Sequence, residues 1–226
     1  MSATPVTPRP AASVMLVRQG ARGLEILFLR RNPTLAFHGG YWVFPGGRID
    51  ADDADPDAPG DEAAAARRAA VREAREEAGV EVTPESLAFA VHWTTPEVSP
   101  IRFATWFFVA RAPTERITVD GGEIHAHQWL GPADALARQA AGDIKLAAPT
   151  FALTTRMAAF DDVETALAAV AGWPEERLLG DLLDVEGGQV ALYHQDAAHG
   201  DGRLDLPGPR HRLWMLESGW RYERAF

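Results

Sequence analysis

An α/β sandwich with mixed β-sheets is the fold class that the order of segments along the chain predicts. Two apolar runs near the start are separated by a short turn, and a long helical segment follows them. Further strand-like runs, two more helical segments and a last group of strand-like runs complete the chain. Strands and helices in this mixed order are typical of layered α/β domains.

Short apolar runs bounded by turn residues predict the strands. They are residues 11–18, 24–30, 87–94, 102–111, 125–130, 179–185, 189–194 and 212–224. Residues 19–23 have the composition of a turn, so the first two runs are expected to form a β-hairpin. Residues 41–44 are a further apolar stretch, and the pair Gly46 and Gly47 is expected to turn the chain after it.

Helices are predicted at about residues 61–78, 132–141 and 150–171. Gly79 follows the first helix and suits the left-handed conformation that ends many helices. The loop before this helix, residues 51–60, is rich in Asp, Pro, Ala and Gly. We expect it to be a solvent-exposed insertion without structure of its own.

Length and composition bound the domain organisation and the classes of partner. A chain of 226 residues can bury one good core, and we expect a main domain at residues 11–145 with an extension at residues 146–226 that packs on it. The absence of cysteine excludes a disulfide framework and a thiolate zinc site, so a metal would need oxygen or histidine ligands. The formal net charge of -10 argues against a broad nucleic-acid surface, because Lys and Arg chiefly bind phosphate backbones.

The chain lacks the patterns of a membrane span and of a secretion signal. No apolar run approaches the ~20 residues needed to cross a bilayer. Residues 1–13 lack a basic stretch followed by an apolar one. We therefore expect a cytoplasmic protein without membrane contact, and the sequence leaves a homodimer open.

Three carboxylates share one face of the first helix. Glu73, Glu76 and Glu77 fall within an arc of roughly 100°, because residues three and four positions apart lie on the same side of a helix. Such acids repel one another unless a cation lies between them, and Mg²⁺ or Mn²⁺ prefers carboxylate oxygens. The alternative is a solvated face with ion pairs such as Arg72 with Glu76, and the triplet alone does not decide between the two.

The residues around this helix resemble a known family motif. The sequence Phe44 Pro45 Gly46 Gly47, a variable loop and residues 72–80 resemble the Nudix box of the nucleoside diphosphate-linked moiety hydrolases. Residues 72–80 match the box at every specified position. The resemblance implies the Nudix fold, an α/β/α sandwich with a mixed sheet, and metal-dependent hydrolysis of a small-molecule diphosphate.

The spacing within the box is longer than usual. Arg72 lies 25 positions after Gly47, and the position of the early box glutamate, counted back from Arg72, holds Ala64. Asp61 or Glu62 could stand near that position. Asp61 is better explained as a residue at the helix N-terminus, where the helix dipole favours an acid.

The segment before the box resembles one branch of the family. Residues 29–50 are similar to the corresponding segment of coenzyme A diphosphatases with a long box insertion, and Arg31, Asp50 and Asp53 fall where that branch has them. Ala36 stands where many of those enzymes carry a second arginine. The branch implies coenzyme A or acyl-coenzyme A as the substrate, cleaved to 3′,5′-ADP and a 4′-phosphopantetheine product.

The resemblance also implies roles for the acids. Glu73, Glu76 and Glu77 would hold Mg²⁺ or Mn²⁺, and Arg72 would orient these glutamates through salt bridges. Glu73 or Glu123 would act as the base that takes a proton from water. An acid on a surface loop explains Glu123 equally well.

Four further positions are expected to bind the substrate or shape its site. The backbone of Gly46 and Gly47 would shape the cation site, and Arg31 would bind the substrate. Arg102 could clamp a phosphate through its fork of donors, although it could equally be an exposed arginine at a strand edge.

Substrates and functions other than coenzyme A hydrolysis remain open. ADP-ribose, NADH or a dinucleoside polyphosphate could be hydrolysed by the same catalytic residues. A non-catalytic sensor that binds a nucleotide and regulates a partner is a further alternative. The intact Arg-Glu-x-x-Glu-Glu pattern weighs against the sensor, because a sensor needs no complete metal site.

Overall fold

The computed structural model describes residues 6–35, 38–58, 60–113 and 116–226, which divide into two compact units. The larger unit comprises residues 10–91 and 105–176. The smaller unit comprises the described part of residues 1–9 together with residues 92–104 and 177–226. The packing of residues 146–226 on a domain formed by residues 11–145 stays a prediction.

A mixed β-sheet forms the centre of the larger unit, with the strand order β3-β2-β1-β6-β5. β1 (Arg9–Gly20) and β2 (Gly23–Arg31) are the antiparallel hairpin that the sequence predicts. β4 pairs with β1, and β7 pairs with β2. The other strands are β3 (Trp42–Val43), β4 (Gly46–Arg48), β5 (Ala88–Thr94), β6 (Phe103–Arg111) and β7 (Ile124–Leu130).

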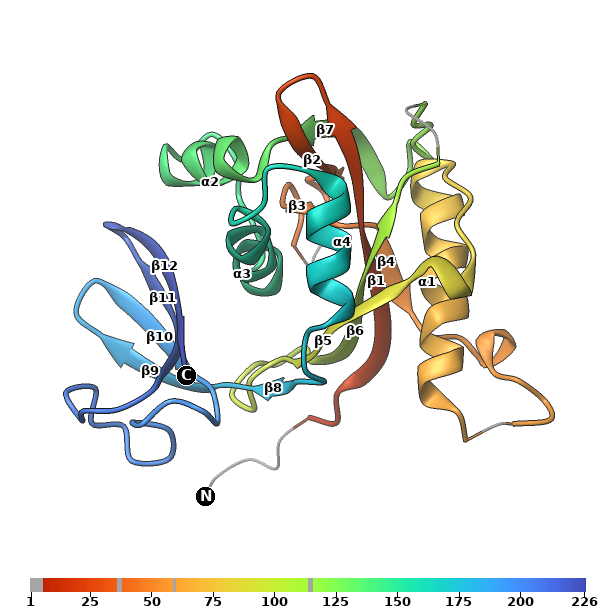
Figure 1. The fold of residues 1–226 in the computed structure, drawn as a ribbon. Helices are drawn as coiled ribbons and strands as arrows, with labels where there is room; N and C mark the ends of the chain where they lie inside the picture. The colour runs from red at the N-terminus through yellow and green to blue at the C-terminus, as the bar shows by residue number, and fades with distance from the viewer. Residues whose placement is uncertain (1–5, 36–37, 59, 114–115) are drawn as a thin grey trace. The chain divides into compact units, whose positions relative to one another are not determined.

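Helix α1 (Glu62–Ala78) covers one face of this sheet (Figure 1). Its predicted boundaries are confirmed, because the Asp61 side chain accepts a hydrogen bond from the Ala64 N–H at 2.9 Å and Gly79 ends the helix at φ 65°. The inner face of α1 is built from alanines and packs into the main core. Small side chains on this face let the helix lie close to the sheet.

The opposite face is covered by α3 (Ala148–Met157) and α4 (Val163–Ala171), and α2 (Pro132–Ala140) precedes them (Figure 1). The predicted α/β/α sandwich is therefore confirmed. The prediction of one helix over residues 150–171 is wrong. The Asp162 side chain caps α4 by accepting the Thr165 N–H at 2.8 Å, and the Asp161 carbonyl accepts the Leu24 N–H of β2 at 2.9 Å.

The acidic loop before α1 contains local structure that its composition does not predict. Residues Ala51–Asp53 form a short 3₁₀ helix, η1, and Asp53 is only 5% exposed. The expectation of a loop without structure of its own is wrong at this first turn. A second short 3₁₀ helix, η2 (Pro84–Ser86), follows α1.

An antiparallel sheet with the strand order β12-β11-β10-β9 dominates the smaller unit. Its strands are β9 (Asp181–Val185), β10 (Gly188–Leu192), β11 (Arg210–Leu216) and β12 (Gly219–Ala225). A further strand, β8 (Arg177–Leu179), pairs in parallel with the end of β5. The predicted strands at residues 179–185 and 212–224 are each divided, the first at Gly180 and the second by a turn. Within the described residues, no helix is long and apolar enough to cross a membrane.

A buried ion pair joins the loop between β10 and β11 to strand β11 of the smaller unit. The Arg212 guanidinium donates to both carboxylate oxygens of Asp196 at 2.7 and 2.5 Å. Asp196 also accepts the backbone N–H groups of Ala198 and His211. Burial alone would raise the pKa of Asp196, but the hydrogen bonds from Arg212 and the two N–H groups lower it to about 2.

We expect Asp196→Asn to destabilise the protein by about 3 kcal/mol at pH 7, because it leaves the Arg212 charge buried without its partner. The pKa of Asp196 is lowered on folding, so its contribution is complete above the unfolded pKa of about 3.9 and is lost as the pH falls toward 2. Denaturant unfolding followed by circular dichroism between pH 2 and pH 7 should show the mutant and wild type converging at low pH. The exposed Asp205→Asn is the control, and equal stability of Asp196→Asn and wild type at pH 7 would contradict this assignment.

Candidate active site

Two glycines of β4 let the acids of α1 approach the sheet. A Cβ atom on Gly47 would lie 2.3 Å from a carboxylate oxygen of Glu73, and one on Gly46 would lie 2.6 Å from the Ala12 carbonyl oxygen of β1. Neither glycine has a positive φ, and both belong to a short strand rather than to the expected turn. Their role is therefore to permit close contact of backbone and side chain.

Glu77 is the most buried acid of the group. Its side chain accepts the Gly46 N–H at 2.9 Å, and the residue is 5% exposed. Burial, together with the nearby carboxylates of Glu73 and Glu123, raises its pKa to about 8 against the opposing effects of the Gly46 hydrogen bond and Arg31. A carboxyl group in this position gains strongly from any added positive charge.

Glu73 lies beside it and is also largely buried. Burial raises the pKa of Glu73, Arg72 lowers it, and the neighbouring charges of Glu76 and Glu123 raise it further. Glu76 is more exposed, at 50% of its side chain. We call Glu73, Glu76, Glu77 and Glu123 the carboxylate cluster, because electrostatic interactions link each of them to at least one other member.

Arg72 bonds two members of the cluster through one nitrogen. Its Nη1 donates to Glu73 at 2.8 Å and to Glu76 at 3.1 Å, while Nη2 donates to the Arg48 carbonyl at 2.9 Å. The other side of the guanidinium contacts Asp53. The hydrogen bond with Asp53 is the largest cause that raises the pKa of Arg72.

Arg31 and Glu123 meet at the end of the β2–β7 pairing. Arg31 Nη2 lies 2.6 Å from Glu123 Oε1, and their side chains are 16% and 50% exposed. The register of β2 and β7 shifts between Arg30 and Arg31, and Asn32 donates its N–H to the Glu123 carbonyl at 2.7 Å. The structure thus brings Arg31 and Glu123 to the cluster from segments far apart in the chain.

Arg102 belongs to the smaller unit and is buried rather than exposed. Only 5% of the residue is accessible, and its guanidinium donates to the carbonyls of Thr95 at 3.1 Å and Val6 at 2.7 Å. The expected exposed arginine at a strand edge is therefore wrong. Phosphate binding by Arg102 stays a prediction, and these two bonds show a local structural role.

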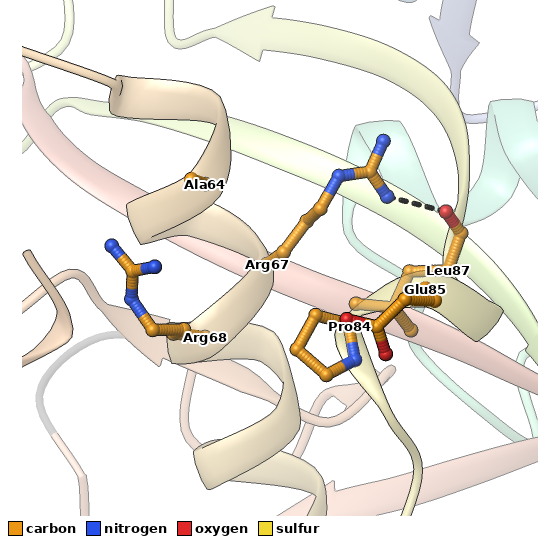
Figure 2. Close-up of a pocket in the computed structure, with 6 residues that line it drawn as sticks. All are labelled: Ala64, Arg67, Arg68, Pro84, Glu85 and Leu87. Carbon is orange, nitrogen blue, oxygen red and sulfur yellow. Dashed lines mark hydrogen bonds between the residues drawn. The ribbon is translucent and has the colours of Figure 1, made fainter. Parts of the chain in front are cut away.

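The position that the box spacing singled out, Ala64, carries no acid. Ala64 lines a surface hollow of about 500 Å³ between α1 and η2, together with Arg67, Arg68, Pro84, Glu85 and Leu87 (Figure 2). Arg67 turns toward the Leu87 carbonyl, whereas Arg68 turns to the other side (Figure 2). Asp61 caps α1, and Ala36 lies outside the described residues.

The donor chemistry of the cluster fits a divalent cation. Glu73 and Glu76 each use one carboxylate oxygen for Arg72, which leaves a second oxygen for a cation. Across residues 6–35, 38–58, 60–113 and 116–226, no three His, Asp or Glu side chains are already arranged as metal ligands. Hard oxygen donors and mutual repulsion are the properties that favour Mg²⁺ or Mn²⁺.

Asp53 is the residue of this site to which sequence reasoning gave no role. Counting back from Arg72 pointed to Ala64, whereas the acid outside α1 that hydrogen-bonds with Arg72 is Asp53 of η1. The signal that could have found it is its early place in the loop, where the branch resemblance already marks Asp50 and Asp53. Its burial could not be predicted from the sequence, because the residues around it are mostly polar or small and are typical of an exposed loop.

Comparison with known proteins supports the family. The NUDIX domain model matches residues 7–150, whereas no curated protein matches the chain. A NUDIX hydrolase from Alicyclobacillus acidocaldarius has a similar structure, with a TM-score of 0.65, 23% identity, and coverage of 74% of this chain and 99% of that chain. The NUDIX domain of Shewanella oneidensis NrtR, solved with ADP ribose, has a TM-score of 0.51, 16% identity, and coverage of 67% of this chain and 86% of that chain.

A MutT protein from Methanosarcina mazei Go1 has a TM-score of 0.50, 17% identity, and coverage of 70% of this chain and 96% of that chain. At these identities, the structures show the fold alone. The domain match extends over more than half of the chain, and Nudix hydrolases generally use divalent metal ions. The chain therefore belongs to the Nudix family of hydrolases and is a pyrophosphohydrolase.

Proposed function

We propose that this enzyme hydrolyses the diphosphate linkage of coenzyme A or an acyl-coenzyme A with the help of Mg²⁺ or Mn²⁺. The observation that carries the proposal of cation-dependent hydrolysis is the carboxylate cluster, flanked by Arg31 and Arg72. The resemblance of residues 29–50 to coenzyme A diphosphatases supports the choice of substrate. The products would be 3′,5′-ADP and 4′-phosphopantetheine or its acyl derivative.

Glu73, Glu76 and Glu77 would hold the cation. Glu77 is the best fixed of these acids, because it is buried and bonded to the backbone of β4. When bound, a divalent cation offsets the charge of the diphosphate and makes water easier to deprotonate. Arg72 donates to both Glu73 and Glu76 through Nη1, so it holds the two carboxylates next to each other.

Glu123 or Glu73 would take the proton from the attacking water. Glu123 is half exposed, so solvent reaches it, while Glu73 is nearer to the protein interior. As the water oxygen bonds to phosphorus, the bond from phosphorus to the bridging oxygen breaks, and the base accepts one water proton. Either carboxylate suits this step if it is ionised when the substrate is bound.

Arg31 would bind the diphosphate as a planar, permanently charged donor. In the structure its Nη2 bonds Glu123, so a phosphate oxygen would compete with Glu123 for the same guanidinium. Binding of the substrate at Arg31 would then release Glu123 toward the water. This arrangement supports a role for Arg31 in binding rather than in the chemical step.

ADP-ribose, NADH and dinucleoside polyphosphates stay alternative substrates for the same residues. The similar NrtR domain was solved with ADP ribose, and this is a reason to include that compound in any test. Cytoplasmic location and a homodimer also stay predictions.

We expect hydrolysis to stop when the divalent cation is removed, because the carboxylate cluster cannot offset the diphosphate charge by itself. The measurement is turnover of coenzyme A after treatment with a chelator and again after addition of Mg²⁺ or Mn²⁺. Undiminished turnover by the chelated protein would falsify the proposal of cation-dependent hydrolysis.

Glu76→Gln and Glu77→Gln should each lower kcat by about 100-fold or more, since each removes a charge that holds the cation. The fold should survive, because Gln has nearly the volume of Glu and at position 77 its amide oxygen can still accept the Gly46 N–H, and less repulsion should keep the melting temperature at or above that of wild type. Steady-state kinetics and thermal unfolding test both statements. Glu85→Gln, an exposed change in η2, is the control, and wild-type rates in both variants would show that the ligand assignment is wrong.

Arg31→Ala should raise KM by about tenfold, which corresponds to about 1.4 kcal/mol, and lower kcat less, if Arg31 binds substrate and transition state alike. The neighbouring exposed Arg30→Ala is the matched control. The assay should compare coenzyme A, acyl-coenzyme A, ADP-ribose and NADH, with products identified by mass. A kcat/KM for ADP-ribose or NADH at least tenfold above that of every coenzyme A compound would reject the coenzyme A assignment and leave the diphosphate chemistry intact.

A further inference from the structure

The loop that carries Glu123 is held by the side chain of Asp120. The Asp120 Oδ2 accepts the N–H of Glu123 at 2.8 Å and the N–H of Gly122 at 3.2 Å, and Oδ1 accepts the N–H of Ile124 at 2.9 Å. Burial would raise the pKa of Asp120, but the hydrogen bonds from these three N–H groups lower it below its ordinary value. One ionised carboxylate therefore binds three consecutive backbone donors.

The backbone before Glu123 has few conformational restrictions of its own. Gly121 and Gly122 precede Glu123, all three residues are exposed, and Gly121 has a φ of 76°. Glycines widen the range of conformations that a loop can adopt. Ile124, by contrast, is fully buried in the main core and begins β7. The bonds to Asp120 therefore fix the glycine side of the loop relative to a residue that is anchored in the core.

Asn32 binds the other side of the same peptide groups. Its backbone N–H donates to the Glu123 carbonyl at 2.7 Å, and its Nδ2 donates to the Gly122 carbonyl at 2.9 Å. The Asn32 Oδ1 accepts both the N–H and the hydroxyl of Thr34, at 3.1 and 2.8 Å, and these bonds fix the orientation of the amide. Asp120 thus binds N–H groups of the loop, while Asn32 binds its carbonyls.

These restraints determine where the Glu123 carboxylate lies. Asn32 follows Arg31 directly, so its backbone bond to Glu123 places the side chains of Arg31 and Glu123 next to each other, with Nη2 and Oε1 2.6 Å apart. The Glu123 carboxylate is also near enough to Glu73 and Glu77 to raise the pKa of both. Because half of the Glu123 side chain is accessible, its position depends mainly on the backbone that carries it.

We propose that Asp120 is a positioning residue that fixes the backbone of residues 122–124 so that Glu123 meets the attacking water at the carboxylate cluster. This inference rests on the proposed function, with Glu123 as the base. Both oxygens of Asp120 are bonded to N–H groups of the loop, so by this assignment Asp120 touches neither the substrate nor the cation. Displacement of a reacting group by about 1 Å can cost much of the rate. The effect of Asp120 should therefore appear in kcat, with KM little changed.

The test combines two measurements on the full-length protein. The first is kcat and KM with whichever of coenzyme A, acyl-coenzyme A, ADP-ribose and NADH is hydrolysed fastest, and the second is hydrogen–deuterium exchange of the amides in residues 120–124. We expect Asp120→Ala to speed this exchange at least tenfold and to lower kcat about tenfold, with KM changed less than twofold.

Two further variants provide a graded comparison and a control. Asp120→Asn keeps one acceptor oxygen, so it should lower kcat only about threefold. Asp143→Ala, a change of an exposed aspartate in the same unit, should alter neither measurement. Circular dichroism at the assay temperature confirms that each variant is folded. Wild-type kcat or unchanged exchange in a folded Asp120→Ala or Asp120→Asn protein would overturn the positioning role.

A double-mutant cycle separates positioning of the base from a general effect on the loop. Glu123→Gln should lower kcat about 100-fold, and Asp120→Ala should lower it less than twofold further in that background. A further tenfold loss there would show that Asp120 does not act through Glu123. Wild-type kcat in Glu123→Gln would assign the base to Glu73 and overturn this inference, while the proposed function stands. Wild-type protein that hydrolyses none of the four compounds would instead overturn the proposed function, and this inference with it.

Discussion

The close approach of α1 to strand β4 is the constraint on which the site depends. Gly46 and Gly47 have no side chains, so the carboxylates of Glu77 and Glu73 reach the strand without a clash. The alanine face of α1 allows the same short separation along the sheet. Acids are thereby held in positions where burial disfavours ionisation and like charges repel. Positive charge close to the cluster stabilises the ionised form of these acids.

Two arginines supply part of that charge from different elements. Arg72 belongs to α1 itself, and Arg31 belongs to the end of β2. Arg72 divides its bonds between the carboxylate cluster and Asp53, so its charge is shared among several acids. Under the proposed function, the remaining negative charge would favour a divalent cation, and Arg31 would be the donor that a phosphate engages.

Sequence reasoning succeeds where the determining interactions are local. The ends of α1 follow from Asp61 and Gly79, which act within one turn of the helix, and the acidic face follows from helical periodicity alone. It fails within residues 150–171, where the Asp161 carbonyl between the two helices accepts the N–H of the distant Leu24. The cap at Asp162 is local, and sequence reasoning overlooked it. It also fails for Arg102, because the carbonyls that bury its guanidinium lie up to 96 positions away in the chain.

The long loop between Gly47 and Arg72 shows the same difference between local and distant interactions at the site itself. Asp53, before the extra residues, is bonded to Arg72, and Asp61, after them, is bonded to the Ala64 N–H. Both ends of the segment between Asp53 and Asp61 are therefore attached to α1. Loop closure costs little more for a longer loop once its ends are fixed. A change in length between these two acids is therefore expected to leave the carboxylate cluster in place, and counting positions back from Arg72 cannot locate an acid that lies before the loop.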